Sequence, residues 1–528
     1  SPATRSPAVP SKTPPSPGSK PARPAPVPAE RVRLLDPRPP HPRGRYVLYW
    51  MVASRRLEHN HALDRALELC RELDRPLLIF EPLRSGYRWA SARHHAFVLA
   101  GMADQAQALA GTGVGYLPYV EPQPGAAKGL LGALCAEAAA LVSDDYPCFF
   151  LPHLAAAGAR AAQCRFELVD SNGLLPLSAS EREFPSAHTF RRFLHKTLAP
   201  HLARLPAAEP LAGPPPPALA ALPRGLERRW PSAFAPLAGG AEANREAIAA
   251  ALRSLPIDQG VAPFEGLPGG SAAAAKRLRQ FLSAGLPRYE ERNQPDQDVG
   301  SGLSPYLHFG QISAAGILRA VAKEQRWTPA QLTRPPSGSR EGWWGLPSPV
   351  EGFLDELITW RELGFNACRT NPAYDRFESL PAFARATLAK HARDPRPVRY
   401  THAELEHART HDALWNAAQT QLVREGRMHN YLRMLWGKKV LEWSARPEDA
   451  FESLVELNNK YALDGRDPNS YTGITWVFGR YDRAWGPERP IFGTVRYMSS
   501  DNTARKLSVK GYLARYGPGR SGQQAALF

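Results

Sequence analysis

Five short apolar runs between residues 46 and 169 alternate with longer, alanine-rich stretches, and this alternation constrains the fold more than any other feature. The runs favour β-structure and lie in YVLYWM from 46, PLLIFEPL from 76, GVGYLPYVEP near 113, ALVSDDYP near 140 and FELVDSNGLLPL near 166. Residues 60–73, between the first two runs, have a helical pattern. Strands and helices at this spacing predict a doubly wound α/β domain with a parallel sheet over residues 44–180.

The predicted sheet also indicates where a ligand would bind. Open α/β sheets bind ligands outside the carboxyl ends of their strands. No GxGxxG motif follows the first strand, so the sequence does not support a dinucleotide site of the Rossmann type.

The rest of the 528-residue chain is too long to share one hydrophobic core with this domain. Residues 1–43 are dominated by Pro, Ser, Ala and Arg, which predicts a disordered basic tail. Residues 181–240 include EPLAGPPPPALAALP and are interpreted as an inter-domain linker. Helical patterns dominate residues 241–515 and predict an all-α domain, followed by a short tail over 516–528.

A proline- and glycine-rich segment within residues 326–350 is interpreted as a surface insertion between helices. Its adjacent Trp343 and Trp344 suit either a contact site or a small core within the loop itself, and the second is the more common outcome.

Charge and cysteine content narrow the function classes. The chain has 66 Lys and Arg against 50 Asp and Glu, a formal charge of +16, which suits a nucleic-acid partner but also a solubilising tail or a basic proteome. Five scattered cysteines without a CxxC motif indicate no disulfide framework and no metal site. We expect a reducing, cytoplasmic location, nucleoid-associated in a bacterium, with no membrane span and no secretory signal.

Three tryptophans in the last third of the chain have an informative spacing. Trp436 and Trp443 are seven residues apart on one helical stretch, and Trp415 lies on the preceding helix, which Gly426 is expected to end. Core packing explains any one of them. Together they suit an electron-hopping relay, which only a redox or photoredox protein needs.

Two further patterns suggest a binding site for flat rings. Glu356 and Trp360 are four residues apart, so a helix places them on one face. The alternative to a binding site is a surface helix with a salt bridge at the glutamate and a buried tryptophan. Beyond a helix that Pro447 is expected to begin, the segment 476–498 alternates arginines with aromatic residues. Basic groups between stacking surfaces suit distorted or single-stranded nucleic acid.

Taken in order, these segments closely resemble the class II cyclobutane pyrimidine dimer photolyases. The resemblance rests on DELITWREL at 355–363, THDALWNAAQ at 410–419, GRMHNYLRMLWGKKVLEW at 426–443, LNNKYALDGRDPN at 457–469 and RPIFGTVRYM at 489–498. YEERNQPDQDVGSGLSPYLHFGQIS at 289–313 and YWMVASRRLEHNHAL near residue 50 agree with it. It covers nearly the whole chain outside the tail, the linker and the insertion.

The resemblance implies non-covalent binding of FAD by the helical domain. The implied cofactor-binding positions are Tyr289, Ser301, Gly302, Leu303, Ser304, Arg361, Asn458 and Asp464. Small residues in the SGLS segment would let backbone N–H groups approach the pyrophosphate, and Asn458 would face flavin N5. Phe365, Asn366 and Ala367 stand where relatives usually read Asp-Asn-Phe, a departure expected to change polarity near the flavin.

The implied substrate is DNA that carries a cyclobutane pyrimidine dimer, flipped out of the duplex and split by an electron from photoexcited FADH−. Trp360 and Trp476 would line its pocket, Met434 would pack against it, and Glu356 would hydrogen-bond the 5′ base and stabilise the radical anion. Arg483 and Arg496 would fill the gap left by the extruded bases.

Trp436, Trp415 and Trp443, in that order outward from the flavin, match the relay that resets oxidised FAD. The resemblance therefore implies a carbon–carbon lyase that acts as a monomer. The N-terminal domain is a candidate site for an antenna pigment, such as an 8-hydroxy-deazaflavin. Two alternatives remain: a cryptochrome-like light sensor without repair activity, and a flavin-bound DNA-binding protein without photochemistry.

Overall fold

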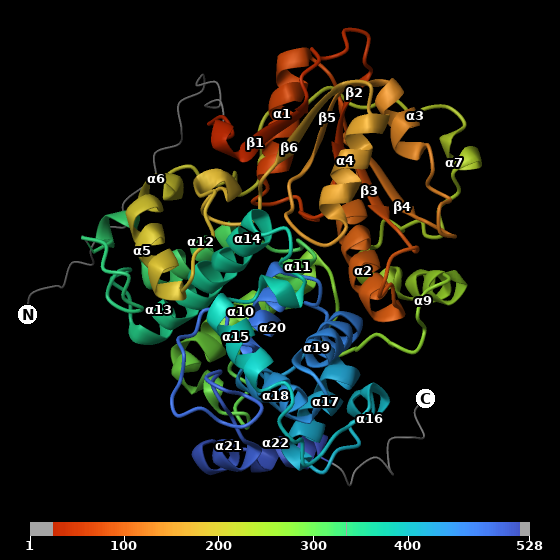
Figure 1. The fold of residues 1–528 in the computed structure, drawn as a ribbon. Helices are drawn as coiled ribbons and strands as arrows, with labels where there is room; N and C mark the ends of the chain where they lie inside the picture. The colour runs from red at the N-terminus through yellow and green to blue at the C-terminus, as the bar shows by residue number, and fades with distance from the viewer. Residues whose placement is uncertain (1–24, 334, 518–528) are drawn as a thin grey trace, which may run out of the picture.

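The computed structural model describes residues 25–333 and 335–517, and it divides into an α/β region and a helical region (Figure 1). The predicted fold class, an α/β domain with a parallel sheet followed by an all-α domain, is confirmed. Within the described residues, none of the helices combines the length and apolar character needed to cross a bilayer. The predicted tails span residues 1–43 and 516–528, and their outer parts, residues 1–24 and 518–528, lie outside the described residues.

The sheet has six strands in the order β1-β6-β5-β2-β3-β4, and all neighbours are parallel except β1 and β6. The chain adds β3 and β4 on one side of β2 and then returns to add β5 and β6 on the other side. The strands are β1 (Val32–Asp36), β2 (Tyr46–Trp50), β3 (Leu77–Leu83), β4 (Gly115–Val120), β5 (Ala138–Asp144) and β6 (Arg165–Val169). The order reverses between β2 and β5, which makes this the switch point of the sheet.

Alternating residues of the central strands pack against helices on both faces of the sheet. Val47 and Tyr49 pack with α1 (His61–Leu73), whereas Leu48 and Trp50 pack with α3 (Leu130–Ala136) and α4 (Leu151–Ala161). Because successive strand side chains point to opposite faces, a strand that is apolar throughout is buried on both. Asn60 caps α1 by accepting hydrogen bonds from two backbone N–H groups, which fixes the predicted helix start.

The predicted tail and linker contain more structure than their composition suggested. Residues 32–36, assigned to the disordered tail, form β1, which pairs antiparallel with β6. The predicted linker, residues 181–240, contains α5 (Ala187–Thr197), α6 (Ala199–Leu202) and α7 (Leu226–Arg229). Phe190 and Leu194 of α5 belong to the core of the helical region, so the helical region begins before residue 240.

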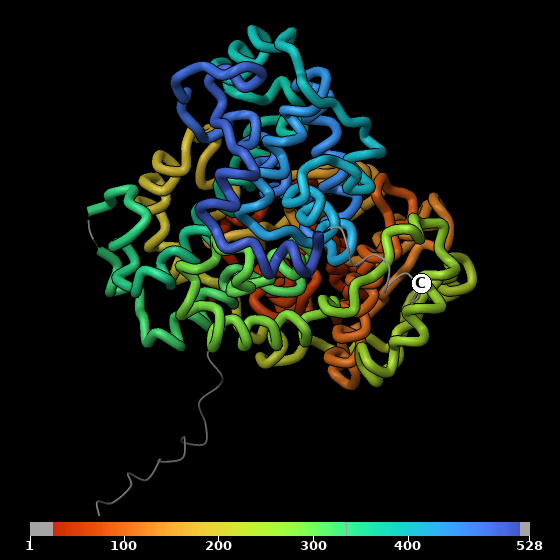
Figure 2. Tube along the Cα trace, turned by 90° about the horizontal axis from the view of Figure 1, so that it is seen from below, coloured from red at the N-terminus to blue at the C-terminus, as the bar shows by residue number. Residues whose placement is uncertain are grey.

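The helical region packs around two large apolar clusters. As predicted, one helix ends at Gly426, which has a φ of +70°, and another begins at Pro447. In Figure 2 the light-green stretch with α8, α9 and α10, which packs against α2 (Ala92–Leu109), runs along the lower edge of the view. The helices are α8 (Gly240–Ala243), α9 (Arg245–Ser254), α10 (Ser271–Gln280), α11 (Ser304–His308), α12 (Ala314–Gln325), α13 (Ser348–Leu354), α14 (Arg361–Thr370), α15 (Ala382–Lys390), α16 (His402–Glu406), α17 (Ala413–Glu425), α18 (Asn430–Trp443), α19 (Pro447–Tyr461), α20 (Pro468–Val477), α21 (Ser500–Lys506) and α22 (Lys510–Tyr516).

The described part of the 326–350 insertion contributes a small aromatic cluster. Trp343 and Trp344 are both buried and meet edge to face, and Trp343 stacks on His195 of α5 at a ring-centroid distance of 4.2 Å. The indole N–H of Trp327 donates to the carbonyl of Trp344 over 2.7 Å. Both tryptophans are thus core residues rather than an exposed contact site, but the core is that of the helical region and not one of the loop's own, because α5 and α13 supply the packing partners.

A buried carboxyl at the domain interface makes stability depend on pH. Glu362 of α14 accepts the backbone N–H groups of Leu174 and Leu175, over 2.6 and 3.0 Å, from the loop after β6. Burial raises the pKa of Glu362 from 4.5 to about 7, despite these donors. Folding therefore favours the protonated form. The stability it contributes is present below about pH 4.5 and is lost as the pH rises through about 7.

We expect titration of Glu362 to lower the free energy of unfolding by about 3 kcal/mol as the pH rises from about 4.5 to above 7. Urea denaturation at pH 5 and at pH 8 measures it. Glu362→Gln lacks a titrating group there, so its stability should change less between the two pH values, although the amide satisfies only one of the two N–H donors. An equal pH dependence in both proteins would contradict this origin.

Candidate active site

Glu356 lies on a π-helical turn, Asp355–Trp360, between α13 and α14. Arg191 of α5 fixes this turn, because its guanidinium donates to both carboxylate oxygens of Asp355 over 2.7 and 2.9 Å. The sequence predicted an ordinary helix, and the four-residue spacing of Glu356 and Trp360 fits either geometry. Single π-helical turns within α-helices occur frequently at functional sites.

The Glu356 carboxylate is held by two donors and remains partly open. The Tyr289 hydroxyl donates to one oxygen over 2.9 Å, the Arg292 Nε donates to the other over 2.7 Å, and a third of the Glu356 side chain is exposed. Burial and the nearby Glu356 carboxylate raise the pKa of Tyr289 well above its ordinary value, so the phenol remains a donor. Tyr289, predicted near the cofactor, thus positions Glu356. Arg292 is absent from the sequence-based site, although it lies three residues after Tyr289 in the same motif.

Trp360, one helical turn after Glu356, stacks face to face on Trp476, and this pair is called the aromatic wall. Their rings stack with centroids 4.5 Å apart and planes at 15°, and Tyr481 meets Trp360 edge-on at 6.2 Å. Both indoles are half-buried, and the Trp476 N–H donates to Asp482 over 3.1 Å. The structure therefore brings together two residues that are 116 positions apart in the chain and that the sequence assigned to one pocket. Met434 is also half-buried, on α18.

The segment after this wall presents a cationic aromatic surface. The guanidinium groups of Arg483 and Arg496 lie over the Trp485 ring, 4.9 and 5.5 Å from its centroid. Trp485 is 39% exposed and Arg483 is exposed. Two cations on an exposed indole suit contact with phosphates and unstacked bases.

The predicted cofactor residues on α19 and in the loop after it lie among polar side chains. The Asp464 carboxylate pairs with Arg433 of α18 over 3.3 Å, and Asn458 is buried on α19. Arg433, which sequence reasoning missed, directly precedes Met434.

In the SGLS segment, Gly302 has a φ of +64°, and Arg277 donates to the carbonyls of Gly300 and Ser301. Leu303 is buried, and Ser304 begins α11.

Arg361 and the unusual Phe365 both lie at the domain interface. Arg361 donates to the carbonyl of Asn172 in the α/β region, and its guanidinium lies 4.6 Å from the centroid of the Phe365 ring. Phe365 packs edge-on against Tyr146, which follows β5, at 5.5 Å. Ala367 is buried. Phe365 therefore contributes apolar contact between the two regions.

The three tryptophans of the predicted relay are buried on the adjacent helices α17 and α18. Trp415 and Trp443 meet edge to face with ring centroids 5.4 Å apart. The Trp415 N–H donates to the backbone carbonyl of Trp436 over 3.0 Å, and the Trp436 N–H donates to Gln419 over 2.9 Å. Trp415 therefore contacts both of the others, and the relay order 436, 415, 443 stays a prediction.

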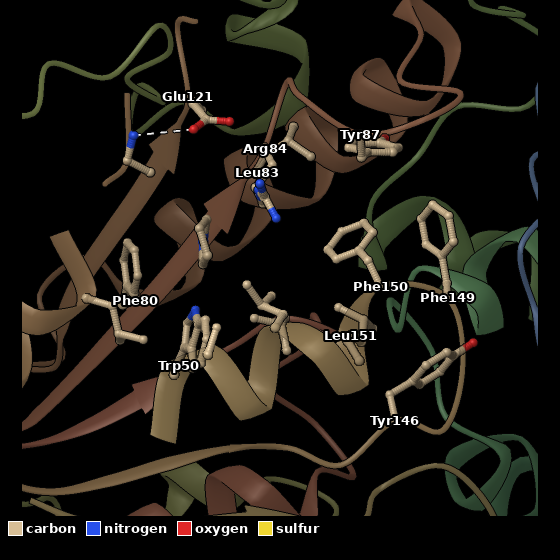
Figure 3. A pocket seen from close by; sticks show the side chains of 18 of the residues that line it. Trp50, Phe80, Leu83, Arg84, Tyr87, Glu121, Tyr146, Phe149, Phe150 and Leu151 are labelled. Atoms are coloured by element: carbon tan, nitrogen blue, oxygen red, sulfur yellow. Dashed lines mark hydrogen bonds between the residues drawn. The ribbon is translucent and has the colours of Figure 1, made fainter. Parts of the chain in front are cut away.

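A separate cavity of about 540 Å³ lies at the switch point of the sheet (Figure 3). Trp50 and Phe80 line it from the ends of β2 and β3, and Leu151 of α4 lines another wall. Most of the lining is apolar; further lining residues include Leu83, Arg84, Tyr87, Glu121, Tyr146, Phe149, Phe150, His308 and Arg466. Arg466 is buried, its Nη1 donates to the carbonyl of Asn459 over 2.7 Å, and its Nη2 has no partner among the described residues.

Comparisons with known proteins agree with these features. The family model for DNA photolyase matches residues 47–214. The deoxyribodipyrimidine photo-lyase of Methanothermobacter thermautotrophicus is 34% identical over 493 residues, which cover 92% of this chain and 98% of the relative. Its counterpart in Oryza sativa subsp. japonica is 33% identical over 94% of this chain and 93% of the relative. That of Potorous tridactylus is 31% identical over 89% and 81%.

A bacterial class III photolyase from Agrobacterium tumefaciens has a similar structure, with a TM-score of 0.64 over 90% of this chain and 86% of that chain. At 17% identity this match shows a shared fold. The predicted family is confirmed at the level of the photolyases, while membership of class II stays a prediction. Over nearly its whole length, the chain belongs to the DNA photolyase family.

Proposed function

We propose that the protein repairs cyclobutane pyrimidine dimers in DNA by light-driven electron transfer. The observation that carries this proposal is the aromatic wall of Trp360 and Trp476 beside the partly exposed Glu356 carboxyl. A flipped-out dimer presents flat faces and carbonyl edges, which stacking rings and a fixed hydrogen-bonding group recognise. The deoxyribodipyrimidine photo-lyase names of the relatives point the same way.

The donor set around Asn458 fits the edge of a flavin. Arg433 and Asn458 carry N–H donors for ring carbonyls and N5, and Asp464 carries an acceptor for a ring N–H. We propose that these residues, together with Arg361 and the segment from Ser301 to Ser304, bind FAD. Reduced FAD, when bound and excited by light, would supply the electron that splits the dimer and would take it back afterwards.

The chain's own groups would bind and orient the lesion. Glu356, fixed by Tyr289 and Arg292, would hydrogen-bond the 5′ base and stabilise negative charge that develops on it. The stacked pair of Trp360 and Trp476 would pack against the dimer through the surfaces that remain open and would exclude water, with Met434 beside them. Arg483 and Arg496, which flank Trp485, would occupy the space vacated in the duplex.

The cavity at the switch point suits an antenna pigment. Its volume of about 540 Å³ and its aromatic lining fit a tricyclic ring such as an 8-hydroxy-deazaflavin, and Arg84, Glu121 and His308 are among its polar lining residues. We expect the protein to act as a monomer. Its five cysteines are buried and unpaired, which suits a reducing, cytoplasmic location.

Replacing Trp443 with Phe should slow photoreduction of oxidised FAD severalfold, because an electron must then cross the gap between Trp415 and the surface. Repair by protein that is already reduced should stay unchanged, since the relay serves only to reset the cofactor. Absorbance during continuous illumination measures photoreduction, and dimer repair is measured after chemical reduction. Equal photoreduction rates in the unaltered protein and in Trp443→Phe would show that Trp443 is not part of the relay.

The function is testable in a bacterial host that lacks its own photolyase. Expression of the chain should raise survival after ultraviolet irradiation when the cells are then exposed to blue light, and should have no effect in the dark. If blue light does not raise survival, although the protein still binds and photoreduces FAD, the result would instead favour a cryptochrome-like sensor.

A further inference from the structure

The loop that joins α20 to α21 lies beside α15 (Figure 1), and its Trp485 is exposed. The middle part of this loop folds back on itself. The Trp485 backbone N–H donates to the carbonyl of Thr494 over 2.8 Å, and Arg489 and Gly493 exchange two backbone hydrogen bonds, over 3.0 and 2.7 Å. Residues 485–494 therefore form a compact hairpin loop, with Trp485 at one of its ends.

The turn of the hairpin loop has a strained backbone. Ile491 has a φ of +71°, in the left-handed region, which a β-branched side chain adopts only at a cost in free energy. The Ile491 side chain is 6% exposed and, with Phe492 and Val495, belongs to an apolar cluster of the helical region. A backbone of this kind persists only where its surroundings hold it, and such residues concentrate at binding and catalytic sites. The contacts that hold Ile491 are therefore informative.

Two side chains, one of α15 and one of the turn after it, hold the hairpin loop. One carboxylate oxygen of Asp394 accepts the backbone N–H of Ile491 over 2.8 Å, and the same oxygen lies 2.6 Å from Nδ1 of His391. The hydroxyl of the buried Thr387 accepts the backbone N–H of Thr494 over 3.0 Å. The Ile491 N–H and His391 keep the pKa of Asp394 below its ordinary value, so the carboxylate is ionised at neutral pH. Asp394 and Thr387 are called the clamp.

The clamp reaches the proposed DNA contacts through the backbone. Thr387 bonds to Thr494, and Thr494 bonds to Trp485, so the position of the indole depends on α15. The guanidinium groups of Arg483 and Arg496 lie over the same indole ring. The clamp therefore fixes the cationic aromatic surface as a whole before DNA binds.

We propose that Asp394 and Thr387 are positioning residues for the recognition of damaged DNA. The inference rests on the proposed function, in which the cationic aromatic surface contacts the duplex around the flipped-out dimer. Neither residue has to touch the DNA. Their role is to keep the hairpin loop in its strained form, so that Trp485 and the two arginines meet the duplex already arranged. A loop that is ordered in advance avoids the conformational entropy that would otherwise be lost on association.

Removal of the Asp394 charge and removal of the clamp have opposite expected effects on DNA affinity. A lost carboxylate reduces repulsion of the phosphates and should tighten binding, whereas a lost clamp should weaken it. Asp394→Ala removes both the charge and the acceptor, while Asp394→Asn removes the charge but keeps an amide oxygen that can accept the Ile491 N–H. Thr387→Val removes only the hydroxyl. Asp501→Ala, at an exposed carboxylate on α21, is the matched charge control.

Fluorescence anisotropy in the dark measures the affinity of the FAD-loaded proteins for a labelled duplex with one cyclobutane thymine dimer and for the undamaged duplex. Asp394→Ala should weaken binding of the dimer duplex about 5- to 10-fold, the scale of one lost hydrogen bond to a charged group. Thr387→Val should weaken it severalfold, and Asp394→Asn and Asp501→Ala should bind at least as tightly as the unaltered protein. Repair yield per absorbed photon at saturating protein should be unchanged in all four variants, because the Glu356 site is intact.

Hydrogen exchange of residues 485–495 tests the clamp without DNA, and these amides should exchange faster in Asp394→Ala and Thr387→Val than in Asp501→Ala. Undiminished affinity of Asp394→Ala for the dimer duplex, or unchanged exchange in the loop, would overturn the positioning role. An equal loss of affinity in Asp394→Asn would do the same. If Asp394→Ala does not bind FAD, Thr387→Val decides by the same criteria. If the unaltered protein binds both duplexes equally, the proposed recognition of dimers is wrong and the inference falls with it, even where the loop exchange responds as expected.

Discussion

Glu356→Ala is expected to lower the yield of dimer repair by about 10- to 100-fold while leaving FAD absorbance unchanged, on the scale of losing one hydrogen bond to a charged group. The carboxyl lies beside the aromatic wall, and Tyr289 and Arg292 fix it in place. Without it, the charge that develops on the flipped base has no fixed partner. Repair yield per absorbed photon, measured with a dimer-containing oligonucleotide, tests this expectation.

A carboxylate elsewhere provides the control for Glu356. Glu452 is exposed on α19, and Glu452→Ala should leave both repair and FAD content unchanged. If Glu356→Ala instead releases FAD, the glutamate is structural and its role in repair is wrong. Arg292→Met should lower repair by a smaller factor, because Tyr289 still holds one oxygen of Glu356.

Arg93→Ala should lower the free energy of unfolding by about 3 kcal/mol, because it leaves several buried carbonyls without donors. Arg93 of α2 is 4% exposed and joins the α/β region to the helical region. Its guanidinium donates to the carbonyls of Val423, over 2.6 Å, and Tyr461, over 3.0 Å, at the C-terminal ends of α17 and α19. A cation at two helix C-termini also interacts favourably with their dipoles.

Burial lowers the pKa of Arg93 to about 10, so it is still charged at neutral pH. Urea denaturation of Arg93→Ala and of Arg160→Ala, an exposed arginine near the end of α4, makes the comparison. Equal midpoints in the two variants would show that Arg93 does not hold the two regions together.

The central strands and most helices of this fold are predictable from local sequence pattern. Strands such as YVLYW are apolar throughout because both of their faces are covered. β1 is different, because VRLLD carries two charged residues and becomes a strand only through its partner β6, more than 130 residues away. α5 lies in a segment whose proline content suggested a linker, and it is fixed by tertiary packing.

The candidate active site likewise combines residues that lie in local sequence motifs with contacts that depend on tertiary packing. Glu356, Trp360 and the three tryptophans of the proposed relay lie in continuous motifs, so the sequence alone could nominate them as candidates. The π-helical turn depends on Arg191, and the position of Glu356 depends on Arg292, both of which are distant in sequence. The cavity at the switch point combines strand ends with Arg466 of the helical region. Contacts of this kind follow from the packing of the two regions and leave no local pattern.

The most direct test of light-driven repair uses chemically reduced, FAD-loaded protein and an oligonucleotide with one cyclobutane thymine dimer. Chromatography counts the intact thymines restored under blue light and in the dark. We predict restoration only in the light, with the flavin still reduced at the end. If no intact thymines appear in the light, while the oxidised protein still photoreduces, the aromatic wall beside Glu356 is not a repair site.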